Sequence, residues 1–164
     1  MSKFIIQGPN VLKGEISVNG AKNAALKIIA ASLLSTEEVT IKNTPKIEEV
    51  DRLLELCEKV GTKFSWNGSE LKMQTSDILT SELDPVLVNK IRASVLMIGP
   101  VLLRQKRVRL PHPGGCAIGQ RPIDLFIDGF KKFGAKITED EKGYLFEADE
   151  LKGMTFIFPI VSVT

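Results

Sequence analysis

The segment Ala24-Ala-Leu-Lys-Ile-Ile-Ala-Ala-Ser-Leu-Leu34 decides the fold, because it recurs as Ala93-Ser-Val-Leu-Met-Ile-Gly-Pro-Val-Leu-Leu103 with residue 93 in the place of residue 24, an offset of 69. Both segments are almost wholly apolar, which is typical of buried helices. A short alternating run follows each at the same offset, Val39-Thr-Ile41 and Val108-Arg-Leu110, and this pattern predicts a strand. The repetition indicates that the chain contains two copies of one unit.

An amphipathic helix is predicted next in each copy, over residues 47–60 and 123–133, where apolar side chains recur on one stripe. Each helix runs into a glycine, Gly61 or Gly134, which favours a left-handed cap. These glycines are 73 positions apart, so four residues are inserted in the second copy. The insertion falls within residues 111–121, the loop that carries Cys116.

A pair of strands is predicted to close each copy. The first pair returns through Asn67-Gly68, a dipeptide typical of tight hairpins, and the second through Lys142-Gly143. With a further strand at residues 14–18 before the first helix, the unit is βαβαββ. The sequence therefore predicts an α/β fold of the α+β type, made of about two stacked repeats.

Length and composition are typical of one globular chain, with 164 residues and 43% apolar content. Residues 1–8 lack the features of a signal peptide, and no apolar run reaches the roughly 18 residues of a membrane span. We therefore expect a cytoplasmic protein without a membrane partner. Two cysteines and one histidine are too few for a structural metal site, and a reducing compartment disfavours a disulfide.

Charge is distributed unevenly. Residues 85–123 hold no Asp or Glu but seven cations, namely Lys90, Arg92, Arg104, Lys106, Arg107, Arg109 and Arg121. Such a segment suits an anionic partner: a phosphate, a carboxylate or a nucleic acid. Arg107 and Arg109 alternate with Val108 and Leu110, which favours a solvated strand face for them. Nucleic acid is disfavoured because no aromatic residue is interleaved with the arginines of residues 104–109.

The loop Gly114-Gly-Cys-Ala-Ile-Gly-Gln-Arg121 is a candidate anion site. Its three glycines let the backbone approach a ligand, and the predicted helix that follows directs N–H groups towards anions. It is not a Walker A loop, because Gln120 stands where the lysine is required. Cys116, with His112 and Arg121 within reach in the sequence, is expected to be exposed and polarised, whereas Cys57 lies on an apolar stripe and is predicted to be a packing residue.

Two strand-to-helix junctions carry cations at equivalent places. Lys22-Asn23 follows Gly20-Ala21 in the first copy, and Lys90 and Arg92 occupy the corresponding junction of the second. Anion binding at these junctions and ordinary solvation of the side chains both fit this pattern.

A set of motifs resembles the enolpyruvyl transferases, in family order along all 164 residues. They are Gly8-Pro9, Gly14-Glu15-Ile16, Gly20-Ala-Lys-Asn-Ala-Ala25, Arg92-Ala-Ser94, Pro113-Gly-Gly-Cys-Ala-Ile-Gly119, Arg121-Pro-Ile-Asp-Leu125, Leu151-Lys-Gly153 and Val161-Ser-Val163. The resemblance implies the α/β prism, or inside-out α/β barrel, of that family, built from βαβαββ repeats. Gly-Gly-Cys at residues 114–116 favours the members that act on a nucleotide sugar over the sister enzyme that acts on shikimate phosphate.

By this resemblance the reaction would transfer the enolpyruvyl group of phosphoenolpyruvate to the 3-hydroxyl of UDP-N-acetylglucosamine and release phosphate, the committed step of bacterial peptidoglycan and cell-wall synthesis, without a metal or organic cofactor. Lys22, Asn23 and Arg121 would hold phosphoenolpyruvate, and Cys116 would be the proton donor and the residue alkylated by fosfomycin. The nucleotide-sugar site would comprise Asn23, Arg92, Arg121, Pro122, Ile123, Asp124, Leu125, Ile160, Val161, Ser162 and Val163.

The chain also departs from the family. Complete members add a third repeat and a second lobe that supplies a catalytic aspartate and further arginines, and Ile160 replaces a position that is often lysine. Residues 1–21 would be a strand segment of that second lobe, and residues 22–164 an incomplete lobe with repeats at 22–89 and 90–164. We therefore expect the 164 residues alone to be inactive, the alternative being a non-catalytic nucleotide-sugar-binding module. Exposed apolar faces of residues 24–34 or 93–103 would favour self-association.

Overall fold

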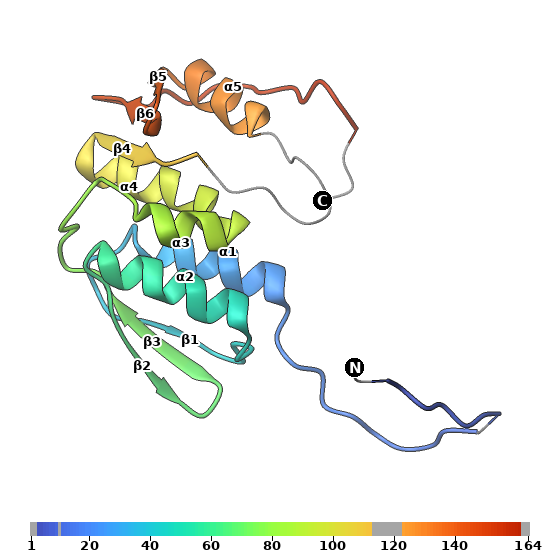
Figure 1. Ribbon diagram of the computed structural model, residues 1–164. Coiled ribbons are helices and arrows are strands. Elements are labelled where there is room, and N and C mark those ends of the chain that lie inside the picture. Colours follow the sequence, from blue (N-terminus) through green and yellow to red (C-terminus); the bar gives the residue numbers. More distant parts are fainter. Residues whose placement is uncertain (1–2, 10, 113–122, 162–164) are drawn as a thin grey trace.

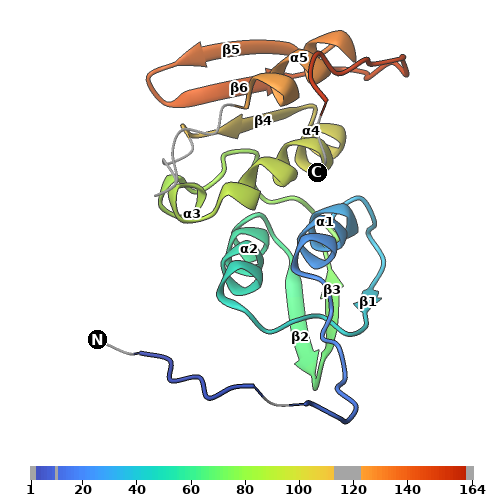
Figure 2. The same cartoon turned by 90° about the vertical axis from the view of Figure 1, so that its right-hand side faces the viewer.

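The structure, a computed structural model, describes residues 3–9, 11–112 and 123–161 of the chain. Among these residues, a three-stranded antiparallel sheet lies at each of two opposite ends, and helices α1 to α4 lie between the sheets (Figure 1, Figure 2). Each sheet belongs to one of the two predicted copies. The helices are therefore the shared interior, and each sheet turns one face towards solvent.

The first copy contains two helices and one sheet. Its elements are α1 (Lys22–Ser32), β1 (Val39–Ile41), α2 (Glu48–Lys59), β2 (Lys63–Asn67) and β3 (Glu70–Gln74), with strand order β1-β3-β2. The second copy has α3 (Pro85–Lys90), the 3₁₀ helix η1 (Arg92–Met97), α4 (Ile98–Gln105), β4 (Arg107–Leu110), α5 (Asp124–Lys132), β5 (Lys136–Asp140) and β6 (Gly143–Glu147), with order β4-β6-β5.

The strand registers confirm the duplication. Met73 in the middle of the first sheet lies opposite Val39 on one side and Phe64 on the other. Phe146 takes the same place in the second sheet, opposite Val108 and Ile137. These pairs are related by the offsets of 69 and 73 found in the sequence, so the four-residue insertion leaves both sheets unchanged and lengthens only the connection between β4 and α5.

Two sequence predictions of secondary structure need correction. Residues 93–103 do not form one α-helix, because η1 comes first and α4 begins only at Ile98. Pro100 then falls in the first turn of α4, where a backbone N–H has no partner within the helix and its absence costs little. Residues 14–18 form no strand; no described strand pairs with them, and an isolated extended segment has no ladder of hydrogen bonds.

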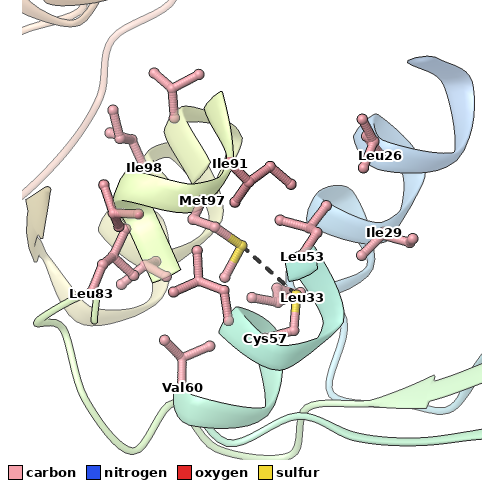
Figure 3. Packing of buried hydrophobic residues seen from close by; sticks show 14 of the residues in the cluster. Leu26, Ile29, Leu33, Leu53, Cys57, Val60, Leu83, Ile91, Met97 and Ile98 are labelled. Atoms are coloured by element: carbon pink, nitrogen blue, oxygen red, sulfur yellow. Dashed lines mark hydrogen bonds between the residues drawn. The ribbon is translucent and has the colours of Figure 1, made fainter. Parts of the chain in front are cut away.

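The core lies where α1, α2, η1 and α4 meet (Figure 3). Cys57 is fully buried there, with its Sγ 3.8 Å from the sulfur of Met97, which confirms its prediction as a packing residue. Burial in these apolar surroundings raises the pKa of the Cys57 thiol to about 12. After α2 the chain reverses at Gly61, whose φ of 112° is the predicted positive-φ cap, and Gly134 follows α5 with a φ of 102°.

Exposed apolar side chains lie only in part where the sequence placed them, since Ile28, Leu34 and Leu103 are 47%, 52% and 47% exposed in the predicted segments. The helices of residues 24–34 and 93–103 bury most of their apolar residues, including Ile29, Leu33 and Val101. Longer exposed apolar stretches are residues 4–9 and 11–18, which extend away from the rest of the described chain, and residues 154–161 (Figure 1, Figure 2).

Candidate functional site

Lys22 is the first residue of α1, and a carboxylate from α2 faces it. The Nζ atom of Lys22 lies 2.6 Å from Oε2 of Glu49, and both side chains are about half exposed. The start of α1 has no side-chain cap and no acidic residue in its first turn. The cation thus stands at the positive end of a helix dipole, where anions are favoured.

The position of Lys22 follows from a close backbone contact at Gly20. A Cβ atom on Gly20 would lie 1.8 Å from the carbonyl oxygen of Asn43, so only glycine fits there. The loop that carries Asn43 is itself fixed. The N–H of Thr44 donates to the carbonyl of Ser69 at 2.9 Å, and its hydroxyl donates to the carbonyl of Ile41 at 3.1 Å.

This junction borders a small cavity of about 410 Å³. The lining residues come from the segment before α1, the β1–α2 loop and the hairpin turn, and they are Asn19, Asn43, Thr44, Pro45, Lys46, Ile47, Gly68 and Ser69. The cavity shows that the segment leading to Lys22 and the loop leading to Glu49 meet at one place.

A larger cavity of about 790 Å³ lies between α1, α5 and the C-terminal segment, a volume usual for ligand pockets. It brings together three residues of the predicted nucleotide-sugar site, Leu125, Ile160 and Val161. The remaining lining residues are mostly aromatic: Lys27, Phe126, Gly129, Phe130, Phe133, Phe156 and Phe158. Such walls suit the flat face of an aromatic ring, and Lys27 adds a cation from α1.

Sequence reasoning missed Lys27 and the phenylalanines of this cavity. One signal was present, because Lys27 is the only charged residue within the apolar segment 24–34. Phe156 and Phe158 had no comparable signal. They reach the cavity through the course of residues 154–161, which carry no helix or strand to predict.

The other predicted site residues are dispersed or lie outside the described residues. Asn23 is exposed on α1, and Arg92 is partly buried at the start of η1. Ile123 is buried, and Asp124 begins α5, where a negative charge favours the helix start. Cys116, Arg121, Pro122, Ser162 and Val163 lie outside the residues that the structure describes.

The arginines of residues 104–109 serve the fold. The guanidinium of Arg104 donates to the carbonyls of Leu33, Thr75 and Ser76 at 3.0, 2.6 and 2.7 Å. Arg109 is not the solvated side chain that strand alternation predicted. Its side chain is 14% exposed and forms ion pairs with Glu82 and Asp140. Its hydrogen bonds to Asp140 lower the pKa of that carboxyl.

Neither a metal cluster nor a membrane-spanning helix is present among the described residues. No three His, Cys, Asp or Glu side chains of residues 3–9, 11–112 and 123–161 are arranged to hold a metal ion. None of the described helices is long and apolar enough to cross a membrane.

Similarity to known proteins extends over nearly the whole chain. A family described as EPSP synthase (3-phosphoshikimate 1-carboxyvinyltransferase) matches residues 6–164. A protein of Elusimicrobium minutum named UDP-N-acetylglucosamine 1-carboxyvinyltransferase is 39% identical over 166 residues, covering 100% of this chain and 39% of that protein. The protein of the same name from Enterobacter cloacae is 42% identical, covering 99% and 39%. The chain thus spans about two fifths of the length of these relatives.

Solved structures support the fold class. The enolpyruvyl transferase NikO from Streptomyces tendae superposes with a TM-score of 0.74 at 23% identity, covering 88% of this chain and 32% of that one. EPSP synthase from Acinetobacter baumannii gives 0.66 at 15% identity, covering 92% and 35%. At these identities the likeness concerns the fold alone, and it confirms the predicted α/β fold of the enolpyruvyl transferases.

Proposed function

Because this chain belongs to the EPSP synthase family of enolpyruvyl transferases, we propose that it takes part in transferring the enolpyruvyl group of phosphoenolpyruvate to the 3-hydroxyl of UDP-N-acetylglucosamine, with release of phosphate. The observation that carries the proposal is the 36–42% identity, along the chain, to relatives named for that activity. The reaction would serve peptidoglycan synthesis in the bacterial cytoplasm.

Phosphoenolpyruvate is assigned to the start of α1. Lys22 and Asn23 would meet its phosphate there, and Arg121 would add a second cation. The uncapped helix start supports this, because its N–H groups and the ammonium both favour an anion. Cys116 would donate the proton that the methylene carbon accepts, a role for a thiol with a pKa near the working pH.

UDP-N-acetylglucosamine is assigned to the larger cavity. Leu125, Ile160 and Val161 line it, and its phenylalanines offer a face for the uracil ring. The family often has lysine at the position of Ile160. Lys27 lines the same cavity and would supply a cation there in its place. Arg92, Arg121 and Asp124 complete the proposed contacts, together with Asn23, Pro122, Ile123, Ser162 and Val163.

Residues 1–21 are proposed to be a strand segment of a second lobe, the lobe that complete members of the family have in addition to the one described here. A polypeptide of only these 164 residues is then expected to lack turnover. A second function, binding of the nucleotide sugar without catalysis, is favoured by one observation: Leu125, Ile160 and Val161, three of the residues proposed to contact the sugar nucleotide, line the larger cavity together.

Phosphate release tests the reaction in the full-length protein, by which we mean a polypeptide that joins this chain to the further length that its relatives have. It should require both phosphoenolpyruvate and UDP-N-acetylglucosamine, and Lys22→Ala should reduce it at least a hundredfold, a loss typical of a charge-stabilising group. Release with shikimate 3-phosphate in place of the nucleotide sugar would overturn the substrate assignment.

Calorimetric titration of the 164-residue polypeptide with UDP-N-acetylglucosamine tests the binding function. Ile160→Asp should abolish any heat of binding, because it puts a carboxylate inside the cavity. Ile157→Asp is the matched control, since Ile157 is exposed and does not line the cavity. An absence of binding by the unaltered polypeptide would exclude the binding module.

A further inference from the structure

Glu49, the carboxylate that pairs with Lys22, has a role that rests on the proposed function. We propose that Glu49 is a positioning residue: its carboxylate holds the Lys22 ammonium while the anion site is empty and is exchanged for the phosphate of phosphoenolpyruvate when that substrate binds. Glu49 thereby sets the affinity of the site for anions.

Lys22 needs a partner because of where it stands. It is the first residue of α1, whose dipole is positive at that end, and neither a capping side chain nor an acid in the same turn offsets the charge. The 2.6 Å contact with Glu49 supplies the missing negative charge from a neighbouring helix. An anion bound at the start of α1 would seek the same ammonium and would therefore compete with this carboxylate.

Glu49 is distinct from the other acids at the start of α2. The first turn of α2 also holds Glu48 and Asp51. Arg52, on the same helix, lies 3.6 Å from Glu48 and 3.0 Å from Glu55. Glu48 is thus paired within α2, whereas Glu49 pairs across to α1.

The placement of this pair is built into the fold, but the pair itself is weak. The Gly20–Asn43 contact and the hydrogen bonds of Thr44 fix the two helix starts against each other. The Lys22 and Glu49 side chains are 48% and 49% exposed, and ion pairs exposed to that degree contribute little. A phosphate brings more charge than a carboxylate and forms charge-assisted hydrogen bonds with both the ammonium and the free N–H groups. Exchange in its favour is therefore expected.

Glu49→Gln in the full-length protein tests the proposal. The variant removes the carboxylate that competes with the phosphate for the Lys22 ammonium. We expect the KM for phosphoenolpyruvate, and the Kd for the same ligand by calorimetry, to fall about three- to tenfold, as loss of a partly screened charge a few ångströms away implies. Glu48→Gln is the matched control, since it removes the same charge one residue away, and it should leave both constants within about twofold of the wild type.

A double-mutant cycle shows whether the effect acts through Lys22. In a Lys22→Met background, Glu49→Gln should change the Kd less than twofold, because the residue through which it acts is gone. Equal or weaker binding by Glu49→Gln than by Glu48→Gln would overturn the role of Glu49 and leave the proposed function standing. Absence of binding and turnover in the wild type would overturn both. Thermal unfolding of each variant confirms that the compared proteins are folded.

Discussion

At Gly20 the backbone passes so close to Asn43 that a side chain has no room. Gly20→Ala is therefore expected to destabilise the protein by about 1–3 kcal/mol, the usual cost of overpacking, and to move Lys22 away from Glu49. Denaturant unfolding measures the change in free energy. Gly129→Ala is the control, because no atom lies within 4 Å of the added methyl group and alanine is favoured in α5 by up to about 1 kcal/mol. Equal stability of Gly20→Ala and the wild type would contradict the contact.

The two thiols are expected to react very differently. Cys57 is fully buried with its pKa raised to about 12, so almost no thiolate forms near neutral pH. Titration of the native full-length protein with a thiol reagent should label Cys116 first and Cys57 only after unfolding. Cys116→Ser should remove the native labelling and the inactivation by fosfomycin, whereas Cys57→Ala should change neither. Rapid labelling of Cys57 in the native protein would show that the core opens there.

Single residues were predictable from the sequence when their role depended on local pattern. The apolar stripe of residues 47–60 was enough to identify Cys57 as a packing residue. Lys22 was recognised as a candidate cation, but its partner Glu49 was not, because that pairing depends on how two helices pack. The same reason explains Lys27, which joins the larger cavity only through the approach of α5 and residues 154–161 to α1.

Between elements, Arg104 connects three segments of the chain. It lies on α4 and donates to carbonyls at the end of α1 and just after β3. Arg104→Met should lower the free energy of unfolding by about 2–4 kcal/mol, since it leaves several carbonyls without their charged donor. Arg107→Met, which loses one half-exposed ion pair with Glu82, should cost less than about 1 kcal/mol. Urea denaturation of both variants provides the comparison, and similar losses would contradict a structural role specific to Arg104.

The elements themselves were predicted where periodicity and turn chemistry agreed. The helices α2 and α5, their glycine caps and the hairpin through Asn67-Gly68 all follow from local sequence. Residues 14–18 alternate like a strand but have no partner strand among the described residues, and a strand needs one. The prediction of a single helix over residues 93–103 was wrong for a different reason. Pro100 is tolerated in the first turn of an α-helix but not in its middle, so α4 begins only at Ile98.

At the scale of the molecule, duplication accounts for the architecture. Two units with the same strand order and register place their sheets outside and their helices between them, so each unit buries its apolar helix face against the other (Figure 1). The repeat in the sequence predicted the units, and the family resemblance supplied the inside-out arrangement. Neither predicted that the apolar side chains of residues 4–9 and 11–18 would stay uncovered, because that depends on which surfaces the packed helices cover.

Their exposed apolar side chains make residues 4–9 and 11–18 the expected site of self-association in a polypeptide of these 164 residues. The large apolar side chains of these two ranges are 82–99% exposed, and they are Phe4, Ile5, Ile6, Val11, Leu12, Ile16 and Val18. Since burying one such side chain contributes about 1.5–3 kcal/mol, together they offer on the order of 10 kcal/mol to any surface that covers them. Sedimentation velocity should show larger species as the concentration rises.

The location of the contact is tested by substitution. Replacing Ile6, Leu12, Ile16 and Val18 by serine should shift the sedimentation profile towards the monomer, because it removes apolar area without touching the core. Leu34→Ser is the control for the helix face first expected to associate, since Leu34 is 52% exposed in that segment, and it should leave the profile unchanged. A monomer at every concentration would mean that residues 4–18 fold back onto this chain. Association abolished by Leu34→Ser alone would place the contact on the helices instead.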